Sequence, residues 1–217
     1  MVTVLGQQNS IANNFLAELR NIDIQHDSQR FRKNLERLGE VFAYEISKKL
    51  PYQQKDIDSP LGIAPMNLLA QQPVVATILR AGLPFHHGML NFFDHAESAF
   101  VSAYRKHEKD GSFIIQLDYI SAPDLNDKIL ILADPMLATG HSVDVSLKGL
   151  LHYGIPSKIH VVSIISSATG IDYLQRVLPH DTDIWTVAVD NELTAQSYIV
   201  PGLGDAGDLA FGEKMSF

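Results

Sequence analysis

The segment Ile129–Val143, ILILADPMLATGHSV, combines residue types that bind a phosphate ester. An apolar run leads into Asp134, and a turn containing Ala138, Thr139 and Gly140 leads into a helical pattern. Backbone N–H groups in such a turn and at the start of the helix form a concave anion site. A carboxylate before the turn can accept hydrogen bonds from sugar hydroxyls. The alternative is an ordinary strand–turn–helix connection, and the lysine of a P-loop is missing.

Two other segments carry groups of chemical interest. Arg80, in the segment Ile78–Leu83 (ILRAGL), stands where an apolar run ends, and its guanidinium fork suits a diphosphate. The alternative is an arginine that caps the strand in solvent. Tyr198–Asp208, YIVPGLGDAGD, has so little side chain that it can read a small planar ligand only through its backbone. A flexible tail is the alternative there.

The elements that must position these groups follow from the apolar pattern. Residues Ser28–Leu50 carry an apolar stripe at helical spacing, and shorter helices are predicted at Val143–Tyr153 and Ile171–Leu178. Strands are predicted at Val74–Leu79, Ala99–Tyr104, Phe113–Tyr119, Lys128–Ala133, Lys158–Ile165 and Ile184–Val189. Apolar strands that alternate with helices indicate a parallel sheet covered on both faces, with ligands beyond the carboxyl ends of its strands. The proline-containing stretch 51–72 is expected to be an irregular arm or a short connection within the domain.

Composition excludes several classes of protein. The 217 residues are 46% hydrophobic and 19% charged, which is typical of one globular α/β domain. The net charge of −8 argues against binding to nucleic acid or to an anionic membrane, and the lack of cysteine excludes disulfides and thiolate metal sites. Without a signal peptide or an apolar span, a soluble cytoplasmic protein is expected. The pair His86–His87 is expected on an extended or turn segment, not in a metal site.

The motif DPMLATG at Asp134–Gly140 closely resembles the phosphoribosyl-diphosphate (PRPP) loop of the type I phosphoribosyltransferases, in the form found in the uracil phosphoribosyltransferase family. The segments ILRAGL and YIVPGLGDAGD agree with it in order and spacing, and the last is the most specific. The resemblance runs from Arg30–Arg32 almost to the C-terminus. It implies an α/β, type I phosphoribosyltransferase-like fold, with a central mainly parallel sheet flanked by helices and a small hood from the N- and C-terminal parts. A single domain over 1–217 is expected, with its core at about 70–190 and a base-binding segment at about 191–217.

The resemblance implies transfer of the 5-phosphoribosyl group from PRPP to uracil, which gives UMP and diphosphate. Asp134 would bind the ribose, residues 138–142 the 5-phosphate, and Arg80 and Arg105 the diphosphate. The complete expected PRPP site is Arg80, Arg105, Asp134, Pro135, Met136, Leu137, Ala138, Thr139, Gly140, His141, Ser142 and Asp205. The expected uracil site is Ile199, Gly204, Asp205 and Ala206. Asp134 and Asp205 are the candidate catalytic residues, and no residue is identified as the general base for uracil N1.

Further expectations also come from the resemblance. Mg²⁺ is the expected cofactor, carried by PRPP with no assigned ligand from the protein. A homo-oligomer is expected, and GTP, which acts on some relatives, is a candidate effector. His141 stands where the family usually has glycine, and Pro84 and Lys106–His107 are further departures that indicate a divergent branch. His141 is predicted to tune the phosphate site without being essential.

The sequence is also compatible with two alternative functions. The first is a regulatory protein that keeps the fold and senses PRPP or a nucleotide. The acidic charge and the lack of a basic, aromatic-bearing strip count against contact with nucleic acid. The second is a phosphoribosyltransferase for another base, against which the intact YIVPGLGDAG segment counts.

Overall fold

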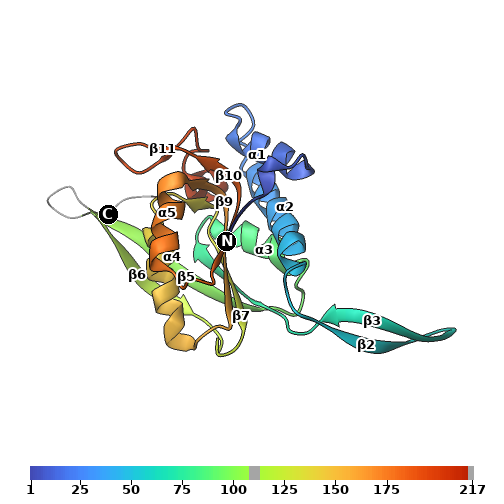
Figure 1. The fold of residues 1–217 in the computed structure, drawn as a ribbon. Helices are drawn as coiled ribbons and strands as arrows, with labels where there is room; N and C mark the ends of the chain where they lie inside the picture. The colour runs from blue at the N-terminus through green and yellow to red at the C-terminus, as the bar shows by residue number, and fades with distance from the viewer. Residues whose placement is uncertain (108–112, 215–217) are drawn as a thin grey trace.

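A computed structural model describes residues 1–107 and 113–214, without the side chains of 104–107 and 113–115. An eight-stranded sheet forms the centre, in the order β1-β10-β9-β7-β4-β5-β6 with β8 beside β9 (Figure 1). Its strands are β1 (Val2–Val4), β4 (Val74–Leu79), β5 (Glu97–His107), β6 (Phe113–Ser121), β7 (Ile129–Ala133), β8 (Met136–Leu137), β9 (Lys158–Ser167) and β10 (Asp183–Asp190). Only β6 runs antiparallel to its neighbour among these described strands. The expected mainly parallel sheet is confirmed.

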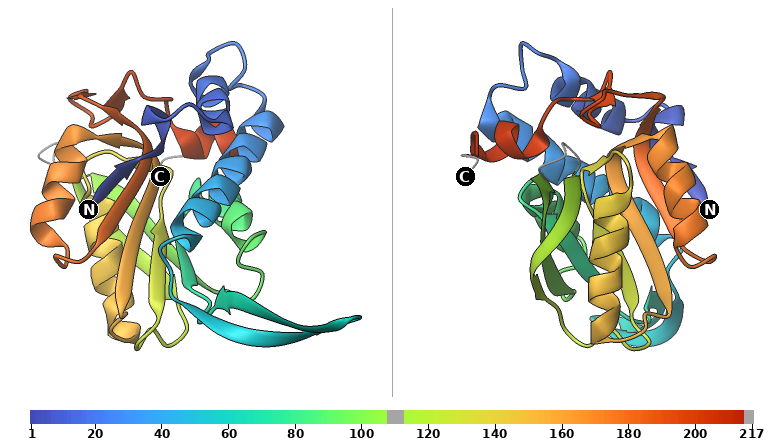
Figure 2. Two further views of the ribbon diagram at one scale, coloured as in Figure 1. Left: turned by 45° about the vertical axis from the view of Figure 1, so that its right-hand side comes forward. Right: turned by 90° about the vertical axis from the view of Figure 1, so that its left-hand side faces the viewer.

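Helices cover both faces of the sheet because its strands are apolar on both sides. On β7, Ile129, Ile131 and Ala133 belong to one core cluster and Leu130 and Leu132 to the other, as the alternation of a pleated strand requires. The first cluster packs under α1 (Ile11–Arg20), α2 (Ser28–Ser47) and α3 (Gly82–Leu90), and the second under α4 (His141–Leu150) and α5 (Ala168–Val177) (Figure 2). Short 3₁₀ turns lie at Leu5–Gln7 and Leu151–Tyr153.

The expected hood is also present. After β10 the chain forms the small pair β11 (Glu192–Leu193) and β12 (Ile199–Val200) and then α6 (Ala206–Phe211). Figure 2 shows this C-terminal segment beside the N-terminal helices, and Arg32 of α2 donates a hydrogen bond to the Ala210 carbonyl. The two ends of the chain therefore form one cover over the carboxyl edge of the sheet.

Two predictions of local structure are wrong. Residues 51–72 are not irregular, because β2 (Tyr52–Ser59) and β3 (Gly62–Leu69) pair as an antiparallel hairpin that projects from the body (Figure 1). Pro65 fits within it because a two-stranded ribbon has two free edges, where a missing N–H is tolerated. The pair His86–His87 lies inside α3, not on an extended segment. No helix of the described residues is long and apolar enough to cross a bilayer.

Candidate functional site

The loop from Asp134 to Ser142 lies at the carboxyl end of β7 and leads into α4, as predicted. Gly140 caps the helix with φ of 84°, a left-handed conformation that favours glycine. A Cβ atom at Gly140 would lie 2.8 Å from Tyr173 Cδ1 and 3.1 Å from the Gly170 carbonyl oxygen. The turn can therefore approach α5 closely only with glycine at this position. Pro135, Met136 and Leu137 lie in the same loop, the last two in β8.

The N-terminus of α5 holds this loop in place. The Ser167 hydroxyl donates a hydrogen bond to the Ala138 carbonyl and accepts one from the Gly170 N–H at 2.8 Å. The backbone N–H of Asp134 donates to the Val162 carbonyl of β9 at 3.0 Å. The contact of Ser167 with the loop cannot be predicted from sequence, because a serine before a helix indicates only a helix cap. The turn that the sequence predicts to bind phosphate is thus held by two neighbouring elements, α5 and β9.

His141 packs on a tyrosine beside the loop. Its ring stacks on Tyr173 of α5 with centroids 4.5 Å apart and planes 24° apart, and its Nδ1 lies 3.0 Å from the Thr139 hydroxyl. The Tyr173 hydroxyl donates to Asp144 at 2.9 Å, and Lys148 donates to the same carboxylate oxygen at 2.9 Å. Burial and the hydrogen bond to Asp144 raise the pKa of Tyr173, so its hydroxyl stays protonated. The exposed imidazole is therefore held at the mouth of the turn.

Arg80 joins the two segments that the resemblance assigns to diphosphate and base. It follows β4, after a cis peptide bond, and its Nη2 donates to Asp208 of α6 at 2.9 Å and to the Gly212 carbonyl at 3.2 Å. Asp208 is 128 residues away in the sequence, so only the fold brings these groups together. Arg105 lies on β5, but its side chain is outside the described part of the structure.

Asp205 caps the N-terminus of α6. Its Oδ1 accepts from the Gly207 and Asp208 N–H groups at 2.9 and 3.0 Å, and its Oδ2 accepts from Lys214 at 2.9 Å. Burial acts to raise the pKa of Asp205, but these hydrogen bonds outweigh it and the pKa lies below its usual value. An ionised carboxylate with three donors orients its neighbours well and is a weak proton acceptor.

The other residues of the expected uracil site lie around Asp205. Ile199 and Ala206 are buried, and Gly204 is exposed with φ of 86°. Gly202 between them has φ of 61°, and a Cβ atom there would lie 2.0 Å from the Ile199 carbonyl oxygen. The segment therefore folds back on itself and presents peptide groups in a fixed turn.

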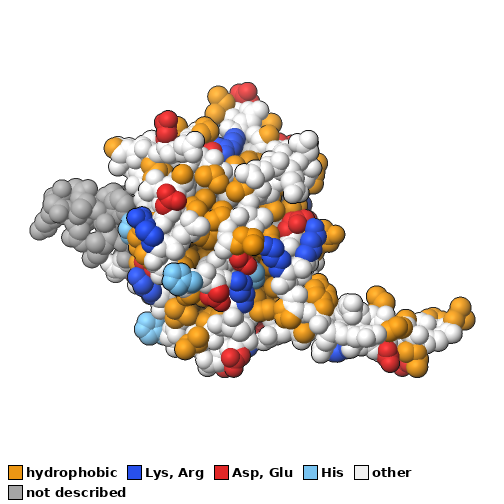
Figure 3. All heavy atoms as spheres, in the orientation of Figure 1, with side chains coloured by type: hydrophobic (Ala, Val, Ile, Leu, Met, Phe, Trp, Pro, Cys, Tyr) orange, Lys and Arg blue, Asp and Glu red, His pale blue; other side chains and the backbone are white. Residues whose placement is uncertain are grey.

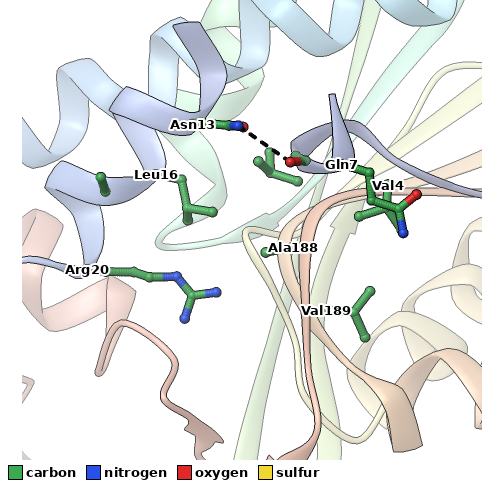
Figure 4. Close-up of a pocket in the computed structure, with 10 residues that line it drawn as sticks. Val4, Gln7, Asn13, Leu16, Arg20, Ala188 and Val189 are labelled. Carbon is green, nitrogen blue, oxygen red and sulfur yellow. Dashed lines mark hydrogen bonds between the residues drawn. The ribbon is translucent and has the colours of Figure 1, made fainter. Parts of the chain in front are cut away.

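A cavity of about 480 Å³ lies between α1 and β10, and none of residues 138–142 lines it (Figure 4). Its walls are apolar, with polar groups from Gln7, Asn13 and Arg20. Its lining contains none of the residues that the sequence predicts to bind PRPP or uracil. Within residues 1–107 and 113–214, no group of three or more His, Asp or Glu side chains is arranged to hold a metal ion.

Comparison with known proteins identifies relatives along nearly the whole chain. A sequence model described as uracil phosphoribosyltransferase matches residues 6–213. The uracil phosphoribosyltransferase of Porphyromonas gingivalis is 54% identical over 97% of this chain and 98% of its own length. That of Methanothermobacter thermautotrophicus is 42% identical over 86% and 85%, respectively. A solved protein structure from Aquifex aeolicus superposes with a TM-score of 0.86 at 29% identity, over 98% of both chains.

Proposed function

The chain belongs to the uracil phosphoribosyltransferase family, and from this premise we propose how its own residues transfer the 5-phosphoribosyl group from PRPP to uracil. In this reaction uracil N1 forms a bond to ribose C1, the C1–O bond to diphosphate breaks, and the N1 proton leaves. Departure of diphosphate gives C1 oxocarbenium character, as in glycoside chemistry. The protein contributes positioning of both substrates and stabilisation of charge on the leaving group.

One observation carries the assignment of residues, namely the 2.9 Å contact between Arg80 and Asp208. It joins the loop proposed for diphosphate to the helix that begins in the segment proposed for uracil. The base and the leaving group must lie on either side of ribose C1, so the two binding segments must be neighbours. In this arrangement Arg80 binds the diphosphate, and Ile199, Gly204 and Ala206 read uracil through their peptide groups.

The other roles follow from position. The N–H groups of residues 138–142 and the hydroxyls of Thr139 and Ser142 bind the 5-phosphate at the start of α4. Asp134, half-buried at the end of β7, accepts hydrogen bonds from the ribose hydroxyls. Asp205 holds the start of α6 and orients the base segment. Arg105 remains a second proposed diphosphate ligand.

Mg²⁺ fits this site as a group that arrives with PRPP. The nearby carboxylate of Asp205 is already committed to three donors, so the diphosphate, the ribose oxygens and water would supply most ligands. When bound, the ion neutralises charge that develops on the leaving diphosphate. The Arg80 guanidinium supplies a second positive charge next to the diphosphate.

We also propose a homo-oligomer in which the β2–β3 hairpin contacts a second copy of the chain. The hairpin projects into solvent with hydrophobic side chains along it (Figure 3), and isolated two-stranded hairpins are marginally stable in water. Its exposed apolar residues are Tyr52, Ile57, Leu61, Ile63, Met66 and Leu68. Light scattering should give a mass above 24.0 kDa, and Ile57→Asp with Ile63→Asp should lower it. A monomeric wild-type chain would contradict this proposal.

An assay of the purified protein with PRPP, Mg²⁺ and a panel of bases tests the function. Uracil should give UMP and an equal amount of diphosphate, while cytosine, adenine and hypoxanthine should give no nucleotide. Turnover of another base, or PRPP binding without turnover, would contradict the proposed function. The same assay with added GTP tests the effector expected from the resemblance, and fractionation of source cells tests the expected cytoplasmic location.

A further inference from the structure

An ion pair at the edge of the hood ties the N-terminal helix to the base-binding segment. Arg20 is the last residue of α1 and Asp190 the last residue of β10. The guanidinium and the carboxylate form two parallel hydrogen bonds, from Nη1 to Oδ2 and from Nη2 to Oδ1, each 2.8 Å long. Bidentate pairs of this kind combine strength with a fixed geometry.

Both partners of the pair also bind Gly202, which lies within the segment proposed to read uracil. Asp190 Oδ2 accepts the Gly202 N–H at 3.0 Å, and Arg20 Nη1 donates to the Gly202 carbonyl oxygen at 3.0 Å. The donor and the acceptor of this one residue are therefore both held by charged side chains. Arg20 belongs to the helix α1 and Asp190 to the strand β10.

The position of Gly202 makes this contact relevant to the base. Gly202 lies between Ile199 and Gly204, and it turns the chain back so closely that a Cβ atom would meet the Ile199 carbonyl. A ligand read by peptide groups is recognised only if these groups point in fixed directions. Rotation of the Gly202 peptide groups would re-aim the groups on both sides of the turn.

The pair is poorly suited to a role in stability alone. The Asp190 side chain is only 8% exposed, and the free energy of removing charges from water largely cancels the attraction within a buried pair. The Arg20 side chain is 22% exposed and lines one side of the cavity between α1 and β10 (Figure 4). The pair instead fixes the orientation of the Gly202 N–H and carbonyl groups.

We propose that Arg20 and Asp190 are positioning residues, which hold the base-binding segment in the shape that recognises uracil. This inference rests on the proposed role of residues 199–206 in binding the base. It assigns no contact with uracil or PRPP to either side chain. Their loss should therefore weaken the use of uracil and leave PRPP binding unchanged.

The test compares Asp190→Asn and Arg20→Lys with the wild-type enzyme in steady-state kinetics and PRPP calorimetry. Each variant should raise the KM for uracil about 10- to 100-fold, the range for loss of a hydrogen bond to a charged group. The Kd for PRPP should change less than about twofold, because neither side chain is proposed to contact PRPP. A general loss of structure would instead weaken the binding of both substrates. For Arg20→Ala, added guanidinium ion should restore part of the uracil KM.

A second bidentate pair of α1 provides a matched control. Glu18 accepts from Arg30 Nη2 and Nε at 2.6 and 2.7 Å and from Asn34 Nδ2 at 2.6 Å, so the hydrogen bonds of this pair join α1 to α2. Glu18→Gln should therefore leave the KM for uracil unchanged.

The possible failures are distinct. A wild-type enzyme that does not use uracil contradicts the proposed function, whereas an active wild type with an unchanged KM in Asp190→Asn overturns this inference. Equal losses for uracil and PRPP would also overturn it, because they indicate a structural role alone. If Asp190→Asn does not fold, Arg20→Lys and the guanidinium experiment decide in the same way.

Discussion

Replacement of Arg80 by lysine should weaken PRPP binding and leave the fold intact. Arg80 donates to Asp208 at 2.9 Å and to the Gly212 carbonyl at 3.2 Å, and its side chain is 41% exposed. A lysine keeps the charge but loses the paired donors that match a diphosphate. The loss of one hydrogen bond between charged groups costs about 1.5–3 kcal/mol, or about one to two factors of ten in Kd.

Asp208 competes with the diphosphate for Arg80, because PRPP must displace its carboxylate. An exposed pair contributes at most about 1 kcal/mol, so displacement of Asp208 by the diphosphate reduces PRPP affinity by less than about tenfold. Asp208→Asn should accordingly bind PRPP as tightly as the wild type or slightly more tightly. It therefore serves as the control for Arg80→Lys.

Calorimetric titration with PRPP and Mg²⁺ measures both variants. The expected order of Kd is Asp208→Asn at or below the wild type, and Arg80→Lys far above it. Thermal unfolding of the ligand-free proteins checks that neither change disturbs the fold. An unchanged Kd in Arg80→Lys would refute the assignment of the diphosphate to this loop.

Three further predictions concern other parts of the chain. Asp134→Asn should lower kcat/KM with PRPP much more than it lowers the melting temperature, and wild-type kinetics would exclude the ribose role. His141→Gly should stay active but bind PRPP less tightly than the wild type, because the ring at the mouth of the turn is lost; an unchanged Kd for PRPP would exclude a phosphate contact. Burial lowers the pKa of His160 to about 4, so native His160 stays neutral where the unfolded chain, with a pKa near 6.5, binds a proton. His160 should therefore make the chain about 2 kcal/mol less stable at about pH 5 than at about pH 7. Urea unfolding at both pH values should show a loss smaller by about this amount in His160→Asn, and equal losses in the two proteins would contradict the prediction.

The strands were the most predictable part of the fold. β4 has the predicted bounds because Val74–Leu79 is an isolated apolar, β-branched run. The helix α3 was not predicted, because Gly82, Pro84 and Gly88 read as breaks. Gly88 instead allows close packing of α3 on α2, since a Cβ atom there would lie 1.9 Å from the Glu36 carbonyl oxygen. Tertiary contact thus overrides local helix propensity.

In the site, too, local features could be predicted from the sequence and long-range contacts could not. The turn with Gly140 was predictable because all of its residues are adjacent in the sequence. The stack of His141 on Tyr173 and the contact of Arg80 with Asp208 were not, because each joins elements that only the fold brings together. The role of Arg20 had no signal at all, since an arginine at the end of a helix is an ordinary C-terminal residue.

A crystal structure of the chain with UMP would test the central claim most directly, because UMP carries both the base and the 5-phosphate. We expect the phosphate on the N–H groups of residues 138–142, the ribose hydroxyls at Asp134, and uracil on the peptide groups of Ile199, Gly204 and Ala206. UMP bound instead in the cavity between α1 and β10, with these loops empty, would contradict the account.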